Sequence, residues 1–251
     1  MNRLFIFVLI CLISTNIFAA GETGLSFLKI GVGARATAMG EAFTAVSDDA
    51  TGMFWNPAGT AWYKERYVHF THNSWIPGIN HEVANVSFPS FGGTVGIGLV
   101  LNNVDDLKRR TIASEEPTGT FSAHDFSFSV NYATMLSDRF SVGVNAKFIN
   151  EKIYFDTASG FAADIGVKYK VFDSGLSVGA VVQNLGSMNE LAQETIKLPQ
   201  TIRAGAAFLC PLRIVQSTWL LTADYVKIVD EDAHIYLGTE VRPVSVLALR
   251  A

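Results

Sequence analysis

The feature that most constrains this chain is an alternation of apolar and polar residues that recurs from Arg66 to the last residue. In residues 126–132, "FSFSVNY", every second residue is apolar and those between are Ser or Asn. The segments 140–148, "FSVGVNAKF", and 161–169, "FAADIGVKY", repeat the pattern. Because successive side chains of a strand point to opposite faces, each segment predicts a β-strand with one apolar and one small or polar face.

The alternation predicts about eleven strands, and several of them run for about ten residues. That length exceeds the usual five or six residues and matches a tilted strand that crosses a bilayer. Charged residues are only 17% of the chain, against roughly a quarter in soluble domains. The strands are expected to begin near Arg66, His81, Thr94, Ser122, Arg139, Ser159, Gly175, Thr201, Thr218, His234 and Val244.

Short and long connections alternate between these strands. The tight turns are "PSFGG", "LSD", "FDSG" and "RP", and the longer links are 103–119, 151–157, 184–200 and 229–233. Outer-membrane barrels have short periplasmic turns and longer extracellular loops, and carry aromatic residues near strand ends. The sequence therefore predicts an all-β fold, a transmembrane antiparallel up-and-down β-barrel. A soluble lipocalin-like barrel, with its polar face outward, is the alternative.

The inward face of such a barrel would carry charges of both signs. We expect these charges to be paired rather than to create one strong field. The candidate lumen charges are Lys147, Asp164, Lys168, Arg203, Asp224, Glu240 and Arg242.

The first twenty residues are predicted to be a cleavable signal peptide for export to the outer membrane. Arg3 supplies a positive charge, Leu4–Ile13 an apolar run, and Ala19–Gly21 a small-residue cleavage zone. An uncleaved anchor is the alternative, but the run is shorter than the ~20 residues that span a bilayer. Cys11 lies inside the apolar run, which disfavours a lipoprotein signal. Its removal leaves Cys210 without a partner for a disulfide.

Residues 21–65 lack the strand pattern and are predicted to form a hatch, a plug in the lumen of a barrel built by residues 66–251. Within the hatch, residues 33–49 predict a short, closely packed helix, and an irregular segment follows. Asn56 precedes Pro57 and is therefore held extended, which we expect to fix the turn into the first strand. The aromatic residues expected to pack against the wall, or to line a hydrophobic path, are Phe43, Phe54, Trp55 and Trp62.

The acidic pair Asp48 and Asp49 is expected to cap the end of the hatch helix or to pair with lumen cations such as Arg203 or Arg242. A nucleotide site is the alternative, because "GVGARA" at 31–36 fits the pattern G-x-G-x-x-A. In that motif the acid ends a second parallel strand, whereas here it ends a helical stretch. Nucleotide binding is therefore disfavoured.

No catalytic or metal site is predicted. His69 and His72 lie three residues apart on a strand and face opposite sides. Ser74 shares a face with His72, which is a weak signal for a nucleophile and base. A net charge of -4 gives no hint of nucleic-acid binding. We expect no enzyme activity, no metal, no cofactor and no nucleic-acid partner.

Residues 25–61 resemble the N-terminal region of the PorV/PorQ proteins, outer-membrane barrels related to the FadL transporters of hydrophobic compounds. The rest of the chain agrees with that family only as alternating strands. The residues that carry the resemblance, and form its hatch motif, are Gly33, Arg35, Met39, Gly40, Glu41, Asp48, Asp49, Asn56 and Pro57, with Ala34, Ala42 and Ala58 beside them.

The resemblance implies a fourteen-stranded barrel with an N-terminal hatch. PorV-like members act in type IX secretion, where they accept or shuttle cargo proteins to the cell surface, and FadL-like members pass fatty acids or other hydrophobic molecules. The partners it implies are outer-membrane lipid, secretion-system components with their cargo, or hydrophobic small molecules. Eleven is an odd strand count, and "RPVSVLALRA" stops in mid-strand, so about three further C-terminal strands are expected.

Overall fold

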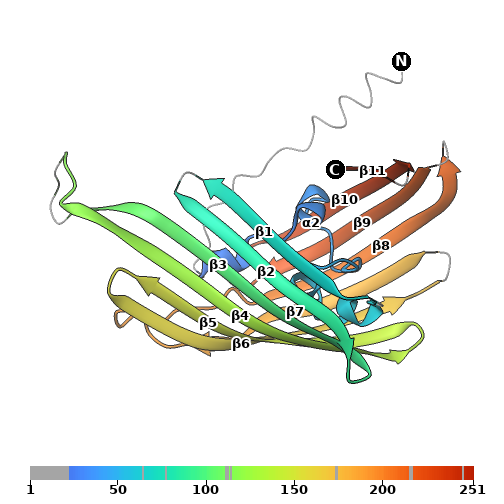
Figure 1. Cartoon of the computed structure of the whole chain (residues 1–251), viewed down its shortest axis with the longest axis horizontal. Helices are drawn as coiled ribbons and strands as arrows, with labels where there is room; N and C mark the ends of the chain where they lie inside the picture. Colours follow the sequence, from blue (N-terminus) through green and yellow to red (C-terminus); the bar gives the residue numbers. More distant parts are fainter. Residues whose placement is uncertain are drawn as a thin grey trace, which may run out of the picture.

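A computed structural model describes residues 23–251, except 64, 77, 111, 112, 114, 173, 174, 215, 216 and 245. The predicted signal peptide therefore lies outside the described residues. The strands form one antiparallel sheet in which each pairs with the next along the chain (Figure 1). This confirms the all-β, up-and-down architecture. Among the described residues, no helix is both long and apolar enough to cross a membrane.

Each of the eleven strands begins within three residues of its predicted position. β3 and β4 are the longest, with 17 and 19 residues. The strands are β1 (Tyr67–Ile76), β2 (Ile79–Ser90), β3 (Gly93–Arg109), β4 (Gly119–Ser137), β5 (Phe140–Ile153), β6 (Asp156–Lys170), β7 (Leu176–Met188), β8 (Thr201–Ile214), β9 (Ser217–Ile228), β10 (Ala233–Val244) and β11 (Leu247–Arg250).

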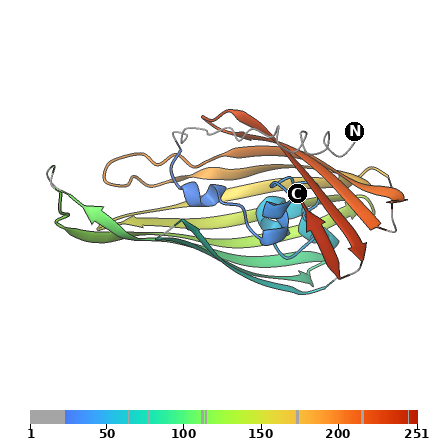
Figure 2. The same cartoon turned by 90° about the horizontal axis from the view of Figure 1, so that it is seen from above.

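The connections give the sheet two different ends. At the end that carries the β2–β3 connection, here called the turn end, no connection exceeds five residues. The opposite end, here called the loop end, carries the connections 110–118 and 189–200. Two predictions were wrong in detail: 151–157 is closed by a tight turn at Tyr154 and Phe155, and the predicted "RP" turn lies inside β10. β1 and β11 are the edges of the sheet, which curves into a trough (Figure 2).

The trough is polar on its concave face and apolar on its outer face. Asn131, Asn145 and Asp164 are fully buried on the concave face, whereas Phe161 is 71% exposed and Ile165 52% exposed on the outer face. A protein folded in water buries its large apolar side chains, so this arrangement is inverted. It suits a wall that faces lipid, and it disagrees with the lipocalin-like alternative.

Residues 23–63 of the hatch lie in the concave face of the trough (Figure 2). They form the short helical segments η1 (Ser26–Lys29), α2 (Ala34–Ala38), α3 (Gly52–Trp55) and η2 (Pro57–Trp62). α2 ends at Ala38 because Gly40 and Glu41 have left-handed backbone, with φ of 57° and 63°. Met39 and Phe43 lie beyond this helix, yet both are fully buried.

Inward-facing glycines of the wall let the hatch backbone approach the sheet closely. A Cβ added at Gly143 of β5 would lie 2.5 Å from Ala58 N, and one at Gly179 of β7 would lie 2.7 Å from Thr44 O. Contacts below 3.0 Å require something to move, and backbone atoms move least easily. The wall is therefore shaped to this hatch.

Gly143→Ala should destabilise the folded protein by about 1–3 kcal/mol, because the added methyl group overpacks the contact with the hatch backbone. Gly119→Ala is the matched control, since no atom lies within 4 Å of its added Cβ. We expect it to change stability by no more than about 0.5 kcal/mol. Urea unfolding of the detergent-solubilised proteins measures both, and equal losses would contradict a close fit.

Candidate functional site

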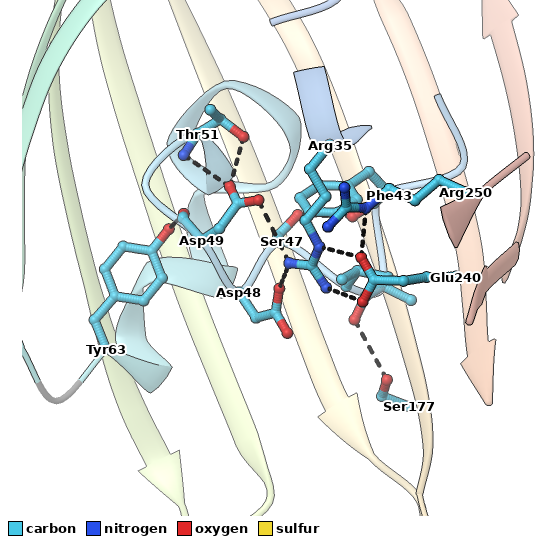
Figure 3. Close-up of polar contacts among 12 residues, drawn as sticks. Arg35, Phe43, Ser47, Asp48, Asp49, Thr51, Tyr63, Ser177, Glu240 and Arg250 are labelled. Carbon is cyan, nitrogen blue, oxygen red and sulfur yellow. Dashed lines mark hydrogen bonds and ion pairs between the residues drawn. The ribbon is translucent and has the colours of Figure 1, made fainter. Parts of the chain in front are cut away.

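The candidate site is a cluster of charges between the hatch and β10, centred on Arg35 of α2 (Figure 3). Arg35 Nε donates to Glu240 Oε2 at 2.9 Å, and Nη2 donates to Oε1 of the same carboxylate at 3.3 Å. Arg35 Nη1 lies 2.5 Å from Asp48 Oδ1 and 3.4 Å from Asp49 Oδ2. The guanidinium also lies 5.3 Å from the ring centroid of Phe43. One side chain thus holds two parts of the hatch together and ties them to the wall.

Glu240 is the carboxylate of β10 on which this cluster converges. Besides Arg35, it accepts from Arg242 Nε at 2.9 Å and from Arg250 Nε of β11 at 2.6 Å. Its side chain is only 4% exposed, and an ionised carboxylate so far from water needs compensating donors. Three guanidinium groups supply them, so the hatch, β10 and β11 meet at one residue.

Asp49 also organises the chain that leads into α3. Its Oδ1 accepts from Thr51 N at 2.9 Å and from Thr51 Oγ1 at 2.6 Å, while the hydroxyl of Tyr63 donates to Asp49 O. Burial raises the pKa of Tyr63 well above 10.0, and the charges of Asp49 and Asp48 add to the effect. The phenol therefore stays protonated as a donor.

The predicted partners of the acidic pair were wrong. Asp48 and Asp49 form their described ion pairs with Arg35 rather than with Arg203 or Arg242. The left-handed turn at Gly40 and Glu41 reverses the chain after α2, which brings residues 13 and 14 positions apart into contact. The hatch thus supplies the cation that its own acidic pair contacts.

Two other lumen charges hold hatch backbone. Arg203 Nη2 of β8 donates to Glu41 O at 2.9 Å, and its guanidinium lies 4.8 Å from the nearer ring centroid of Trp55. Asp224 Oδ2 of β9 accepts from the backbone N–H groups of Phe43 and Thr44, at 3.1 and 2.9 Å. These contacts join β8 and β9 to the turn between α2 and α3.

The remaining lumen charges lie on β5 and β6. Lys168 Nζ donates to Val46 O of the hatch and lies 5.8 Å from the ring centroid of Trp62. Lys147 Nζ lies 2.8 Å from Asp164 Oδ2. All seven predicted lumen charges thus lie on the concave face, where Lys147 pairs with Asp164 and Arg242 with Glu240.

Asn56 and Pro57 anchor the hatch to β6. Asn56 is fully buried and extended, with φ of -153° and ψ of 107°. Its Oδ1 accepts from Ala58 N, which caps η2, and its Nδ2 donates to Thr44 O and Val167 O, both at 3.0 Å. Pro57 begins η2, where its missing N–H removes no hydrogen bond. The pair begins and caps η2 and fastens this segment to the wall, and its role in the turn into the first strand stays a prediction.

The candidate aromatic residues pack against the hatch and the wall. Phe43 and Trp55 meet edge to face with centroids 6.1 Å apart, and Phe54 lies against Gly98 of β3. Trp62 Nε1 donates to Ser141 Oγ of β5 at 2.9 Å. Sequence reasoning missed such wall hydroxyls and amides, although Ser141 stands at a polar position of the alternation.

A cavity of about 500 Å³ opens beside this cluster near the turn end. Its charged lining includes both basic and acidic groups, and Trp62 with several aliphatic side chains forms the rest. The principal residues are Arg35, Asp48, Lys168, Glu240 and Arg242 on the charged side, and Val46, Trp62, Leu176, Leu209 and Leu220 on the apolar side. Among the residues that the structure describes, no group of three or more His, Cys, Asp or Glu could hold a metal ion.

Comparison with protein families identifies a relationship for most of the chain. A family model described as "Type IX secretion system protein PorV" matches residues 16–217, which include the hatch and β1 to β8. No curated protein and no solved structure matches the chain significantly.

Arg35→Met should destabilise the protein by about 3 kcal/mol, because it leaves the buried Glu240 and the acidic pair without their shared cation. Breaking a buried ion pair typically costs about 3–5 kcal/mol. We expect the lower value because Glu240 still accepts hydrogen bonds from Arg242 and Arg250. Lys197→Met is the control: it breaks an exposed pair with Asp230, worth at most about 1 kcal/mol. Equal shifts of the two variants in urea unfolding would contradict a central role for Arg35.

Glu41 should make stability depend on pH. Burial raises its pKa above the ordinary 4.5, and the charge of Arg203 offsets this only in part. Its contribution to the free energy of unfolding is therefore fully present below pH 4.5 and is lost as pH rises through the raised pKa. Glu41→Gln should remove this loss, and the protein should become more stable at pH 7 than the parent. Urea unfolding across pH 4–8 tests this, with the exposed Glu65→Gln as control.

Proposed function

The chain belongs to the PorV family of type IX secretion system proteins, and we propose that it handles secreted cargo proteins at the outer membrane without catalysing a reaction. The family match carries the proposal. The apolar outer face of the sheet supports a place in the membrane, because lipid is the solvent in which exposed Phe161 and Ile165 are favourable.

The hatch supports a role in binding rather than in conduction. It is fastened to the concave face where Asn56 donates to β6, and where Glu240 of β10 and Asp224 of β9 accept from hatch groups. A conduit would have to break these buried polar contacts, and each buried group left without its partner costs free energy. The protein is thus suited to act through its surfaces while the lumen stays plugged.

The loop end is the surface we assign to the cell exterior. The longer connections 110–118 and 189–200 lie there, and in outer-membrane barrels the longer loops are extracellular. The β3–β4 hairpin also reaches beyond its neighbours on this side (Figure 1). Cargo and other components of the secretion system would meet these loops.

Uptake of small hydrophobic molecules, as in the FadL-like transporters, is a second candidate function. The cavity of about 500 Å³ favours it, because apolar side chains such as Leu209 and Leu220 face charged groups such as Lys168 there. A fatty acid has matching parts, an acyl chain and a carboxylate. Passage would require the hatch to leave its seat.

Capture of cargo separates the two functions. The purified protein in detergent should retain a reporter fused to a type IX secretion-signal domain, and should not retain the same reporter without the signal. Binding of a fluorescent fatty acid is measured on the same preparation. Fatty-acid binding without capture of the signal domain would refute the secretion role and favour uptake.

A further inference from the structure

The loop end contains a second cavity, of about 630 Å³, that the charged cluster around Arg35 does not reach. η1 forms one side of it and the inner faces of β2 to β5 form the other. Its lining includes two carboxylates of the wall, Asp125 of β4 and Glu151 of β5. Asp125 and Glu151 are direct partners in the β4–β5 register.

Like charges directly opposite each other on neighbouring strands repel, and a folded protein normally separates or neutralises them. Among the residues that the structure describes, Asp125 accepts a hydrogen bond from the neutral amide of Asn102, at 2.9 Å, and no hydrogen bond or ion pair of Glu151 is found. Lys29 also lines the cavity, but its ammonium group lies 3.0 Å from Glu231. No cation among the described residues forms an ion pair with the two wall carboxylates.

A second observation points to a missing ligand. Asn102 is only 6% exposed and lines the same cavity, yet its Oδ1 has no hydrogen-bond partner among the described residues. Buried polar atoms are normally paired, so this amide oxygen offers a free acceptor to a hydrogen-bond donor inside the cavity.

We propose that this cavity receives a cationic side chain, lysine or arginine, from a polypeptide that binds the loop end. The ammonium or guanidinium group lies between Asp125 and Glu151 and provides the positive charge that the wall lacks. The aliphatic stem packs against Leu25, Phe27 and Ile30 on the hatch side.

A divalent metal ion fits this site less well. Calcium takes six to eight oxygen ligands. The wall offers two carboxylates and one amide oxygen, and the third carboxylate of the lining, Glu41, belongs to the hatch. Among the described residues, no group of His, Cys, Asp or Glu is placed to hold a metal. The apolar part of the lining also has no role in binding a bare ion.

The inference rests on the proposed function only in naming a polypeptide as the partner. Its test uses no cargo: the full-length protein in detergent is titrated by calorimetry with acetyl-Gly-Lys-Gly-amide and with the norleucine peptide that lacks only the charge. The lysine peptide should bind with a Kd about tenfold lower, the size of one charge-assisted hydrogen bond.

Asp125→Asn with Glu151→Gln should abolish this preference while preserving the shape of both side chains. Because the change also removes a like-charge repulsion, the double variant should unfold at an equal or higher urea concentration, which separates lost binding from lost folding. Glu190→Gln, an exposed residue at the same end outside the cavity, should keep the preference.

Equal affinity for the two peptides, or a lysine preference that survives in the double variant, would overturn the inference. The inference would also be overturned if the protein showed no lysine preference but bound calcium, and if the double variant bound calcium more weakly. The site would then be a metal site. Failure of this test with intact capture of the signal domain leaves the proposed function in place. Failure of capture with an intact lysine preference refutes the cargo role alone.

Discussion

The rest of the structure depends on one constraint: the polar groups on the concave face of the sheet need partners, and the hatch supplies them. Because the outer face is made of exposed apolar side chains, the concave face is the place for the amides, hydroxyls and charges of the alternation. Asn131 and Asp224 are almost fully buried there. Asn131 Oδ1 accepts from Thr60 Oγ1 at 2.8 Å, and Asp224 accepts from backbone N–H groups of the hatch. The wall and hatch therefore form one polar core.

This constraint explains how a hatch with little regular secondary structure is held in a defined position against the wall. Helices of four to six residues leave many backbone groups unpaired, and wall side chains bond to several of them. Gln183 donates to Phe54 O at 2.8 Å, and Asn85 donates to Ala50 O at 2.7 Å. The inward glycines then admit the hatch backbone to hydrogen-bonding distance. A longer regular helix would pair most of its backbone N–H and C=O groups internally and would need fewer hydrogen bonds from the wall.

The strands were predictable from sequence because alternation is a local property. Phe128 and Ser129 face opposite sides in any strand that contains them, whatever lies beside it. The pairings in the site were not predictable, because they depend on strand register and on the path of the hatch. Glu240 and Arg250 meet only because they are partners in the β10–β11 register, and Arg35 reaches Glu240 across 205 residues of sequence.

The hatch turn illustrates the same limit at short range. Helical spacing of Ala36, Met39 and Phe43 predicted one helix, but the left-handed backbone at Gly40 and Glu41 ends it early. The spacing of apolar residues does not predict that a non-glycine residue such as Glu41 adopts a left-handed backbone conformation. Because that turn reverses the chain, it also decides which cation the acidic pair meets. The hatch motif could therefore be recognised from the sequence, whereas the contacts that its residues make could not be predicted from it.

The two large cavities lie on opposite sides of the hatch and share no lining residue. The cavity at the turn end is lined by four cationic residues and two acids, whereas the one at the loop end is lined by Lys29 and by three acids, Glu41, Asp125 and Glu151. An anionic ligand would be favoured in the first cavity and repelled in the second, and a cationic ligand would meet the reverse. Movement would also require the buried contacts of the hatch to break. The different charges of the two cavities thus oppose the passage of a single charged ligand from one to the other.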